Sequence, residues 1–281
     1  MEREIDFGNI VLGIIEKGKI PAPVFNPIAI KIQQLVATGP EIGEIVEMVS
    51  LDSKLSASVL QTVNSPFYGL ITKKKTVADA ITHLGVKESG NVVTSATLSK
   101  NFTSNDKQMQ PFMLQLWRHN LGCAIGTQWL CNIVHEELSA QAFLAGLLHD
   151  FGKLILLSAI EKAKKDRTLG LPPLTNQLIY ETLSKFHADQ GFNLLEEMKL
   201  PQEYCSVARD HHLTYKNIDK KNVLLNLVQI ANMVCKEVGI GMSIDDLETD
   251  LLETNEAKLL GLRKETSEKL KEYMKMKMRI T

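Results

Sequence analysis

The sequence predicts an all-α protein. Apolar residues recur at three- and four-residue spacing along nearly all of its 281 residues, which is the period of an amphipathic helix. Aromatic residues make up only 6% of the chain, and the alternation of β-branched residues that marks strands is rare. A hydrophobic content of 44% is typical of a soluble globular protein, and the length allows one large or two ordinary domains.

Short helices separated by proline, glycine and polar residues are expected in the first part of the chain. A break at 50–53 matches a helix N-cap, where Asp52 or Ser53 accepts bonds from backbone N–H groups. Thr76 is expected to cap a further helix and Gly85 to terminate it. The apolar spacing places these helices at residues 9–18, from 28 to the break at 39–40, and at 42–49, 55–63 and 77–84.

A polar stretch at residues 101–111 is expected to form a domain boundary or hinge. Beyond it, a long helix is expected at 112–134, with Trp117, Leu121, Ile125 and Leu130 facing inward. Residues 241–281 are rich in Glu and Lys, and we expect a polar-faced helical tail there. Between residues 134 and 241, two helices are expected to end at 149–150 and at 211–212. Three others are expected at 154–165, 178–200 and 222–238.

One apolar stretch, residues 143–157, contains His149, Asp150 and Lys153. So apolar a run predicts a buried helix that enters a buried turn. Burying an imidazole beside a carboxylate is unfavourable unless something pairs with them. The partner can be a metal ion or a ring of other polar side chains.

Four further histidines lie within or at the end of apolar helices: His119, His187, His211 and His212. Imidazole and carboxylate together form the ligand set of zinc, iron or manganese, and bundle helices commonly supply such sites. The adjacent histidines at 211–212 are about 100° apart on a helix, so both face one site only at a helix end or around two metals. Lys153 follows Asp150 by one turn; it either holds a phosphate near a metal or is a surface lysine that begins the next helix.

Composition excludes several classes of protein. The net charge of −1 gives no support for nucleic-acid binding, and the apolar runs are interrupted before the ~20 residues of a membrane span. The N-terminus lacks a secretory signal, so we expect a cytoplasmic location. Four scattered cysteines are expected to be buried, reduced thiols.

The polar pattern of the second half resembles the HD superfamily of metal-dependent phosphohydrolases, in particular the HD-GYP arrangement. With the motifs of the first half included, residues 18–240 resemble more specifically the HDOD domain, the HD-related output domain of bacterial signalling proteins. The resemblance implies a helical N-terminal subdomain (1–110) packed on an HD-type helical bundle (111–240), with a C-terminal helical tail (241–281). The motifs that carry it are His149-Asp-x-Gly-Lys153, Ile20-Pro-Ala-Pro, Leu51-Asp-Ser-Lys-Leu55, Val63-Asn-Ser-Pro-Phe-Tyr68 and Val77-Ala-Asp-Ala-Ile-x-x-Leu84-Gly85.

The chain departs from the HD enzymes at two places. The resemblance aligns Asn232 with their last metal-binding aspartate, and a neutral amide is a much poorer ligand for a dication. After His212 the sequence continues Leu213-Thr-Tyr, and no Gly-Tyr-Pro follows, so the motif for cyclic-di-GMP hydrolysis is missing. The resemblance therefore implies a site for one or two divalent ions (Fe, Mn or Zn) held by His119, His149, Asp150, His187, His211 and His212, with Asn232 as a degenerate ligand position.

Two functions follow from the resemblance. The first is a bacterial signal-transduction output or interaction module with a protein partner, for which residues 64–75 are the candidate surface. The alternative is an active phosphohydrolase, in which the metal acidifies a bound water and Lys153 neutralises a substrate phosphate. Neither nucleic acid nor a membrane is expected as a partner. The sequence does not predict the oligomeric state, the substrate or the input signal.

Overall fold

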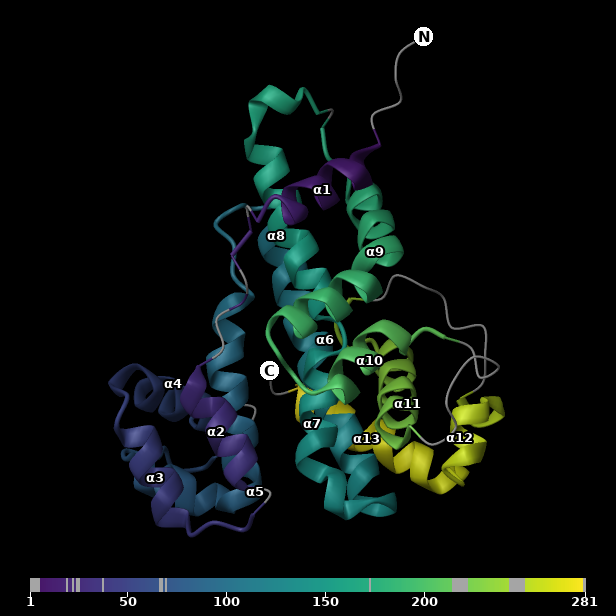
Figure 1. Cartoon of the computed structure of the whole chain (residues 1–281). Coiled ribbons are helices and arrows are strands. Elements are labelled where there is room, and N and C mark those ends of the chain that lie inside the picture. Colours follow the sequence, from purple (N-terminus) through teal and green to yellow (C-terminus); the bar gives the residue numbers. More distant parts are fainter. Residues whose placement is uncertain are drawn as a thin grey trace.

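The computed structural model describes residues 6–18, 20–21, 23, 26–36, 38–65, 68, 70–171, 173–213, 222–242 and 251–279. Across these residues every regular element is a helix, so the all-α prediction is confirmed (Figure 1). The α-helices are α1 (Phe7–Glu16), α2 (Pro27–Val36), α3 (Ile42–Ser50), α4 (Ser53–Val63), α5 (Val77–Leu98), α6 (Met109–Val134), α7 (Ser139–Leu148), α8 (Phe151–Lys165), α9 (Asn176–Glu197), α10 (Gln202–Asp210), α11 (Val223–Glu237), α12 (Asn255–Leu259) and α13 (Lys264–Arg279).

Helices α2 to α5 enclose a small core of their own, which we call the N-terminal lobe; it lies at the lower left of Figure 1. Ile32, Ile45 and Ile81 are fully buried in it. The predicted N-caps are confirmed: the Asp52 carboxylate accepts from the backbone N–H of Lys54 and of Leu55, and the Thr76 hydroxyl accepts from Asp79. These caps satisfy N–H groups that a helix cannot pair internally.

Gly85, which was expected to terminate this helix, breaks the helical geometry of α5 with a positive φ of 76° that side chains with a Cβ rarely adopt. The helix continues beyond this kink to Leu98. Its second half leaves the N-terminal lobe, because Val93 and Ala96 belong to the small core whereas Leu98 belongs to the large one. A single helix therefore joins the two cores.

The larger core is formed by α1 and α6 to α13, and we call this part the histidine lobe. Phe7, Val11 and Ile14 of α1 are buried in it, and α1 packs on α8 far from the N-terminal lobe (Figure 1). The C-terminal helices also contribute, since Leu270 and Met274 of α13 are fully buried. Residues 243–250 and 280–281 of the predicted tail lie outside the described residues.

The apolar stretch around His149 is the centre of this lobe. Gln141–Lys165 is long and apolar enough to cross a membrane, but 89% of its apolar window is buried inside the protein, as in the core helix of a soluble domain. It comprises α7 and α8, joined by a turn at His149 and Asp150. Both residues are buried, with exposed fractions of 0% and 1%, so the predicted buried turn is confirmed.

The inward face of α6 differs in part from the prediction. Ile125 and Leu130 are buried, whereas Trp117 and Leu121 are only half-buried. These two pack against the large core from its edge and, with Ile125, line a cleft between the two lobes. Periodicity cannot separate a residue that faces a core from one that faces a cleft, because both are apolar.

Candidate metal centre

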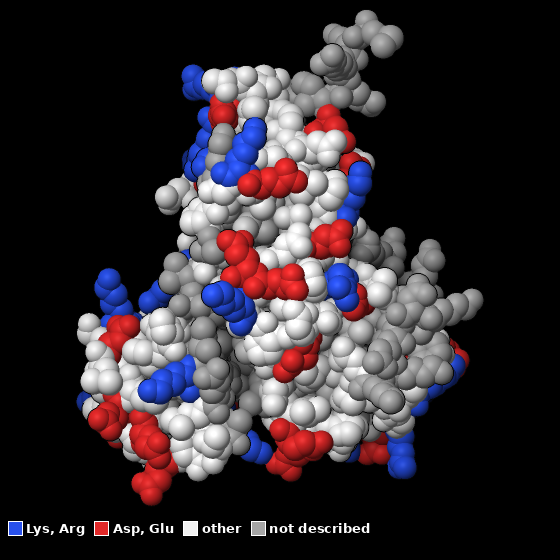
Figure 2. All heavy atoms as spheres, in the orientation of Figure 1, with Lys and Arg blue, Asp and Glu red and all other residues white. Residues whose placement is uncertain are grey.

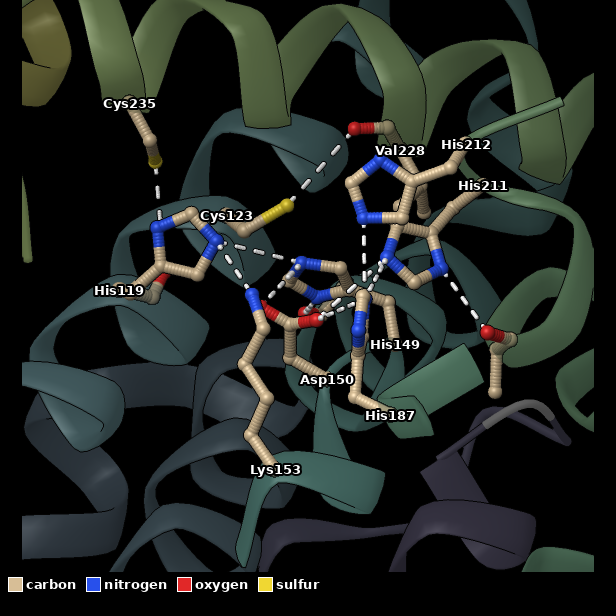
Figure 3. Close-up of polar contacts among 12 residues, drawn as sticks. His119, Cys123, His149, Asp150, Lys153, His187, His211, His212, Val228 and Cys235 are labelled. Atoms are coloured by element: carbon tan, nitrogen blue, oxygen red, sulfur yellow. Dashed lines mark hydrogen bonds and ion pairs between the residues drawn. The ribbon is translucent and has the colours of Figure 1, made fainter. Parts of the chain in front are cut away.

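Six side chains from four regions of the chain converge on one point in the histidine lobe. His119 comes from the middle of α6, His149 and Asp150 from the α7–α8 turn, and His187 from α9. His211 and His212 immediately follow α10, so they are at a helix end, where two adjacent histidines can face one site. Figure 3 shows the five imidazoles arranged around the Asp150 carboxylate.

The Asp150 carboxylate lies between two groups of imidazoles. Its Oδ2 atom is 3.4 Å from Nε2 of His119 and 3.4 Å from Nε2 of His149. Its Oδ1 atom is 3.5 Å from Nε2 of His187 and 3.4 Å from Nε2 of His211. The donor atoms fall into two ligand sets, one of His119, His149 and Asp150 and one of Asp150, His187, His211 and His212, and within each set they lie within 4.8 Å of one another. Asp150 is the member common to both.

The tautomers of four rings follow from their backbone partners. A carbonyl oxygen only accepts hydrogen bonds, so a ring nitrogen beside one must carry the proton. Each contact uses Nδ1, which leaves the Nε2 lone pair of a neutral ring directed at the cluster. The partners are Ile240 O for His119 at 3.4 Å, Gly146 O for His149 at 2.8 Å, Leu183 O for His187 at 2.7 Å and Ala208 O for His211 at 2.9 Å.

These Nε2 atoms lie against one another. His119 Nε2 is 3.3 Å from His149 Nε2, His187 Nε2 is 3.3 Å from His211 Nε2, and His212 Nε2 is 2.9 Å from His187 Nε2. With Nδ1 protonated and the rings neutral, the His119–His149 and His187–His211 contacts each join two acceptors and are unfavourable. The third contact differs, because His212 can donate from Nε2 to the His187 lone pair. A cation among the lone pairs turns the repulsion into coordination, so the donor set fits a transition metal.

Burial keeps the rings neutral. It lowers the pKa of His119 to about 4 and that of His187 to about 3, because the interior disfavours the imidazolium. Burial likewise lowers the pKa of His149 well below its usual range. Burial alone would raise the pKa of Asp150, but the neighbouring Lys153 ammonium holds it well below its usual range. His119, His149, His187 and Asp150 are thus in their metal-binding protonation states at neutral pH.

One carboxylate oxygen of the cluster lacks a hydrogen-bond donor among the described residues. Asp150 Oδ1 is completely buried and accepts no hydrogen bond within the described part of the chain. A buried, ionised oxygen without a donor is costly, which is the situation a metal ion relieves. Asp150 Oδ2 instead accepts from Lys153 Nζ at 2.7 Å.

Lys153 is a buried residue with an exposed fraction of 7%, so its interpretation as a surface lysine is wrong. The first turn of α8 brings it back over Asp150, three residues earlier. Its role as a phosphate contact stays a prediction.

Without metal, the histidines should make stability depend on pH. Their folded-state pKa values are depressed below about 6.5, so the unfolded chain binds more protons between that pH and about 4. We therefore expect the free energy of unfolding of chelator-treated protein to fall as the pH drops through this window, by about 3 kcal/mol from His119 alone. Urea unfolding at pH 7, 6, 5 and 4 measures it. A free energy that is flat over this range contradicts the burial of neutral rings.

Asn232, the degenerate ligand position, lies on α11 and is buried. Its Oδ1 atom has no hydrogen-bond partner within the described residues, which leaves an acceptor available. Its assignment as a lost ligand stays a prediction.

Sequence reasoning missed several residues that support the centre. Gln229 Nε2 donates to the carbonyls of His211 at 3.4 Å and Leu213 at 3.1 Å, and so fixes the end of α10. Two glycines allow close helix contacts: a Cβ on Gly146 would lie 2.7 Å from Cα of Ala124, and one on Gly152 would lie 2.5 Å from N of Gly191. The glycine inside the His-Asp-x-Gly-Lys motif was the available signal, but it does not say which helix comes close.

The cluster meets solvent on one side. Among its residues only His212 is exposed, whereas the others are less than 5% exposed. His212 is therefore the member of the cluster that solvent reaches.

Known proteins share this fold. Residues 22–214 match the HDOD domain. An uncharacterised protein of Treponema pallidum (strain Nichols) is 24% identical over 204 residues, which are 70% of this chain and 38% of that protein. The chain thus corresponds to well under two thirds of this relative.

Solved structures agree over nearly the whole chain. An HDOD domain protein of unknown function from Geobacter sulfurreducens has a TM-score of 0.71 at 17% identity, covering 98% of this chain and 97% of its own. A provisionally named signal transduction protein of Marinobacter aquaeolei VT8 has a TM-score of 0.69 at 19% identity, covering 99% of this chain and 65% of its own. A provisionally named metal-dependent phosphohydrolase of Shewanella amazonensis SB2B has a TM-score of 0.59 at 16% identity, covering 95% of this chain and 98% of its own. At these identities the likeness shows the fold.

Proposed function

The chain belongs to the HDOD domain family, and on that premise we propose that it is a bacterial, cytoplasmic signal-transduction output module whose histidine core binds divalent metal. The observation that carries the metal part is the inward-facing set of Nε2 lone pairs around Asp150. Four of the rings are oriented by backbone carbonyls, an arrangement that fixes the tautomer of metal-binding histidines.

Two ions fit this donor set better than one. Asp150 presents one oxygen to each group of imidazoles, so its carboxylate can bridge two ions. His119 and His149 complete the first ligand set, and His187, His211 and His212 complete the second. The donors are imidazole and carboxylate, which suit Zn, Fe or Mn.

The output function rests on surfaces rather than on the buried centre. We propose the loop at residues 64–75 as the contact for a protein partner. Its shape is set by Asn64, whose Oδ1 accepts from Lys74 N at 2.7 Å and whose Nδ2 donates to Lys74 O at 2.8 Å. Lys73 and Lys75 are exposed beside it. Residues 66, 67 and 69 of this surface lie outside the described part of the chain.

No charge pattern favours nucleic acid as the partner. On the face drawn in Figure 2, basic and acidic side chains are interspersed, and neither forms an extended patch. The net charge of −1 likewise gives no support for nucleic-acid binding.

Phosphoester hydrolysis is the second candidate, and a specific observation favours it. Two ions that share a carboxylate are the arrangement of many phosphoester-cleaving centres, in which the metals generate the nucleophile and neutralise the phosphate. Lys153 adds a buried ammonium 2.7 Å from Asp150 Oδ2, and the exposed side at His212 gives a route for a substrate. Against it stand Asn232 and the missing Gly-Tyr-Pro segment.

A single protein preparation distinguishes the output module from the phosphohydrolase. Protein purified without chelator should contain stoichiometric Zn, Fe or Mn by elemental analysis, His149→Ala should lose it, and the exposed His83→Ala should keep it. The loaded protein is then incubated with phosphomonoesters, nucleotides and cyclic dinucleotides. Turnover that disappears in His149→Ala establishes the hydrolase, and no turnover leaves the output module. Wild-type protein without metal refutes the hydrolase and the metal-binding part of the proposal, whereas the output function, which rests on surfaces, does not depend on that result.

Asn232→Asp tests the degenerate position. If Asn232 faces the centre, a carboxylate there adds a charged ligand, and we expect the metal dissociation constant to fall about tenfold or more. Competition with a chromogenic chelator measures the constant. An unchanged affinity means that Asn232 does not face the metals.

A further inference from the structure

A cleft of about 570 Å³ lies between the two lobes. Its walls come from α4, α5, α6 and α13, and its described lining includes none of the six residues of the metal centre. Trp117 of α6 lines the cleft, whereas His119, two residues on, faces the metal centre. Two residues span about 200° of a helix, so the two sites lie on opposite sides of α6.

The cleft contains a connected row of polar side chains. Tyr68 Oη donates to Glu88 Oε1 at 3.2 Å, and Asn91 Nδ2 donates to Glu88 Oε2 at 3.2 Å. Asn91 Nδ2 also donates to Gln128 Oε1 at 2.9 Å, which links α5 to α6. Burial raises the pKa of Glu88, so its carboxylate is poorly solvated. Glu88 and Gln128 both line the cleft and offer hydrogen-bond acceptors to a ligand that carries N–H groups.

Aromatic rings border the same space. Tyr68, Trp117 and Tyr273 all line the cleft. Neighbours hold two of them: Phe102 packs 5.2 Å from Trp117, and Trp129 stacks on Tyr273 at 5.9 Å between ring centroids. Fixed ring faces bind planar ligands by stacking at little cost in conformational entropy.

The charges in the cleft select an anion. Lys100 and Lys277 line it together with Glu88, so the ionised groups sum to about +1. Lys100 is exposed and able to reach a bound group, and the neighbouring residue Ser99 also lines the cleft. Lys277 lies near the Glu88 carboxylate and over the Tyr273 ring, so the exposed Lys100 ammonium is the group that we assign to attract a phosphate.

We propose that this cleft binds a nucleoside monophosphate. The base stacks against the aromatic side chains, its N–H groups donate to Glu88 or Gln128, and its phosphate contacts Lys100. The volume is in the range of ligand pockets and exceeds what a water cluster needs. Both cores contact Tyr68, so a ligand beside this ring touches the joint between the lobes. The site gives the module a small-molecule input that is independent of the metal.

Trp117 reports on binding directly. The chain has two tryptophans, and Trp129→Phe leaves Trp117 as the single one while keeping a ring against Tyr273. In this background, AMP, GMP, CMP and UMP are titrated separately, with guanosine and inorganic phosphate as partial ligands. We expect saturable quenching by at least one monophosphate, and weaker binding of both partial ligands, since each lacks half of the contacts.

Matched variants locate the site. Lys100→Ala and Glu88→Gln should each weaken binding about tenfold, the effect of losing one charged hydrogen-bond partner. Lys31→Ala, an exposed lysine of α2 outside the cleft, should not. His149→Ala should bind the monophosphate normally, which separates this proposal from metal binding. The proposal is overturned if no monophosphate gives saturable quenching at millimolar concentration, or if both cleft variants bind like the parent while circular dichroism shows them folded.

Discussion

Asp150→Asn is expected to remove nearly all metal from the protein. The Asp150 carboxylate faces both groups of imidazoles, through Oδ2 on one side and Oδ1 on the other. An amide carries no charge and has only one oxygen, so neither ion keeps a bridging anion. We expect the affinity for both ions to fall more than 100-fold, the upper range for changes around a metal ligand. Elemental analysis after dialysis measures the content.

Two controls separate ligand loss from misfolding. Asp150→Asn leaves the Lys153 ammonium buried without its carboxylate, which costs about 3–5 kcal/mol. Asp150→Asn combined with Lys153→Met removes that charge, so this double variant should recover stability but not metal. His212→Ala, which removes the exposed donor of one set only, should retain the ion held by His119, His149 and Asp150. Wild-type metal content in Asp150→Asn contradicts the shared carboxylate.

Gly152→Ala is expected to destabilise the protein by about 3 kcal/mol or more, the upper end of what overpacking costs. Helices α8 and α9 cross where Gly152 meets the backbone of His187 and Gly191. A Cβ there would overlap the carbonyl oxygen of His187 and lie 2.5 Å from N of Gly191. Because these are backbone atoms, relief requires α9 to move, and α9 carries a metal ligand.

Gly13→Ala is the matched control. Gly13 lies within α1, and a Cβ there would meet nothing within 4 Å, so this change should be neutral or stabilise by up to about 1 kcal/mol. Urea unfolding of both variants gives the free energies. A loss below about 1 kcal/mol for Gly152→Ala means that the helix crossing is looser than described.

The helices could be predicted from the sequence because their signals are local. Apolar periodicity marks most of the helices, and side-chain caps at Asp52 and Thr76 mark where two of them begin. Gly85 was correctly predicted to end a helical segment, but not to be a kink through which the helix continues into the other core. That outcome depends on what packs beyond the glycine, which no local pattern records.

The membership of the site could be predicted, but its geometry could not. Polar residues in apolar helices are rare, so the histidines and Asp150 stood out, and the structure brings all six together. The sharing of Asp150 between two ligand sets depends on how four helices cross. The burial of Lys153 has the same origin, since its amphipathic side chain is compatible with a surface as well as with a core.

Anomalous diffraction from crystals grown with Mn²⁺ or Zn²⁺, recorded on both sides of the metal absorption edge, tests the two-ion centre most directly. The structure predicts one peak on each side of the Asp150 carboxylate. One lies beside His119 and His149, and the other lies beside His187, His211 and His212. A single peak, or none, among these residues at saturating metal would contradict the two-ion centre.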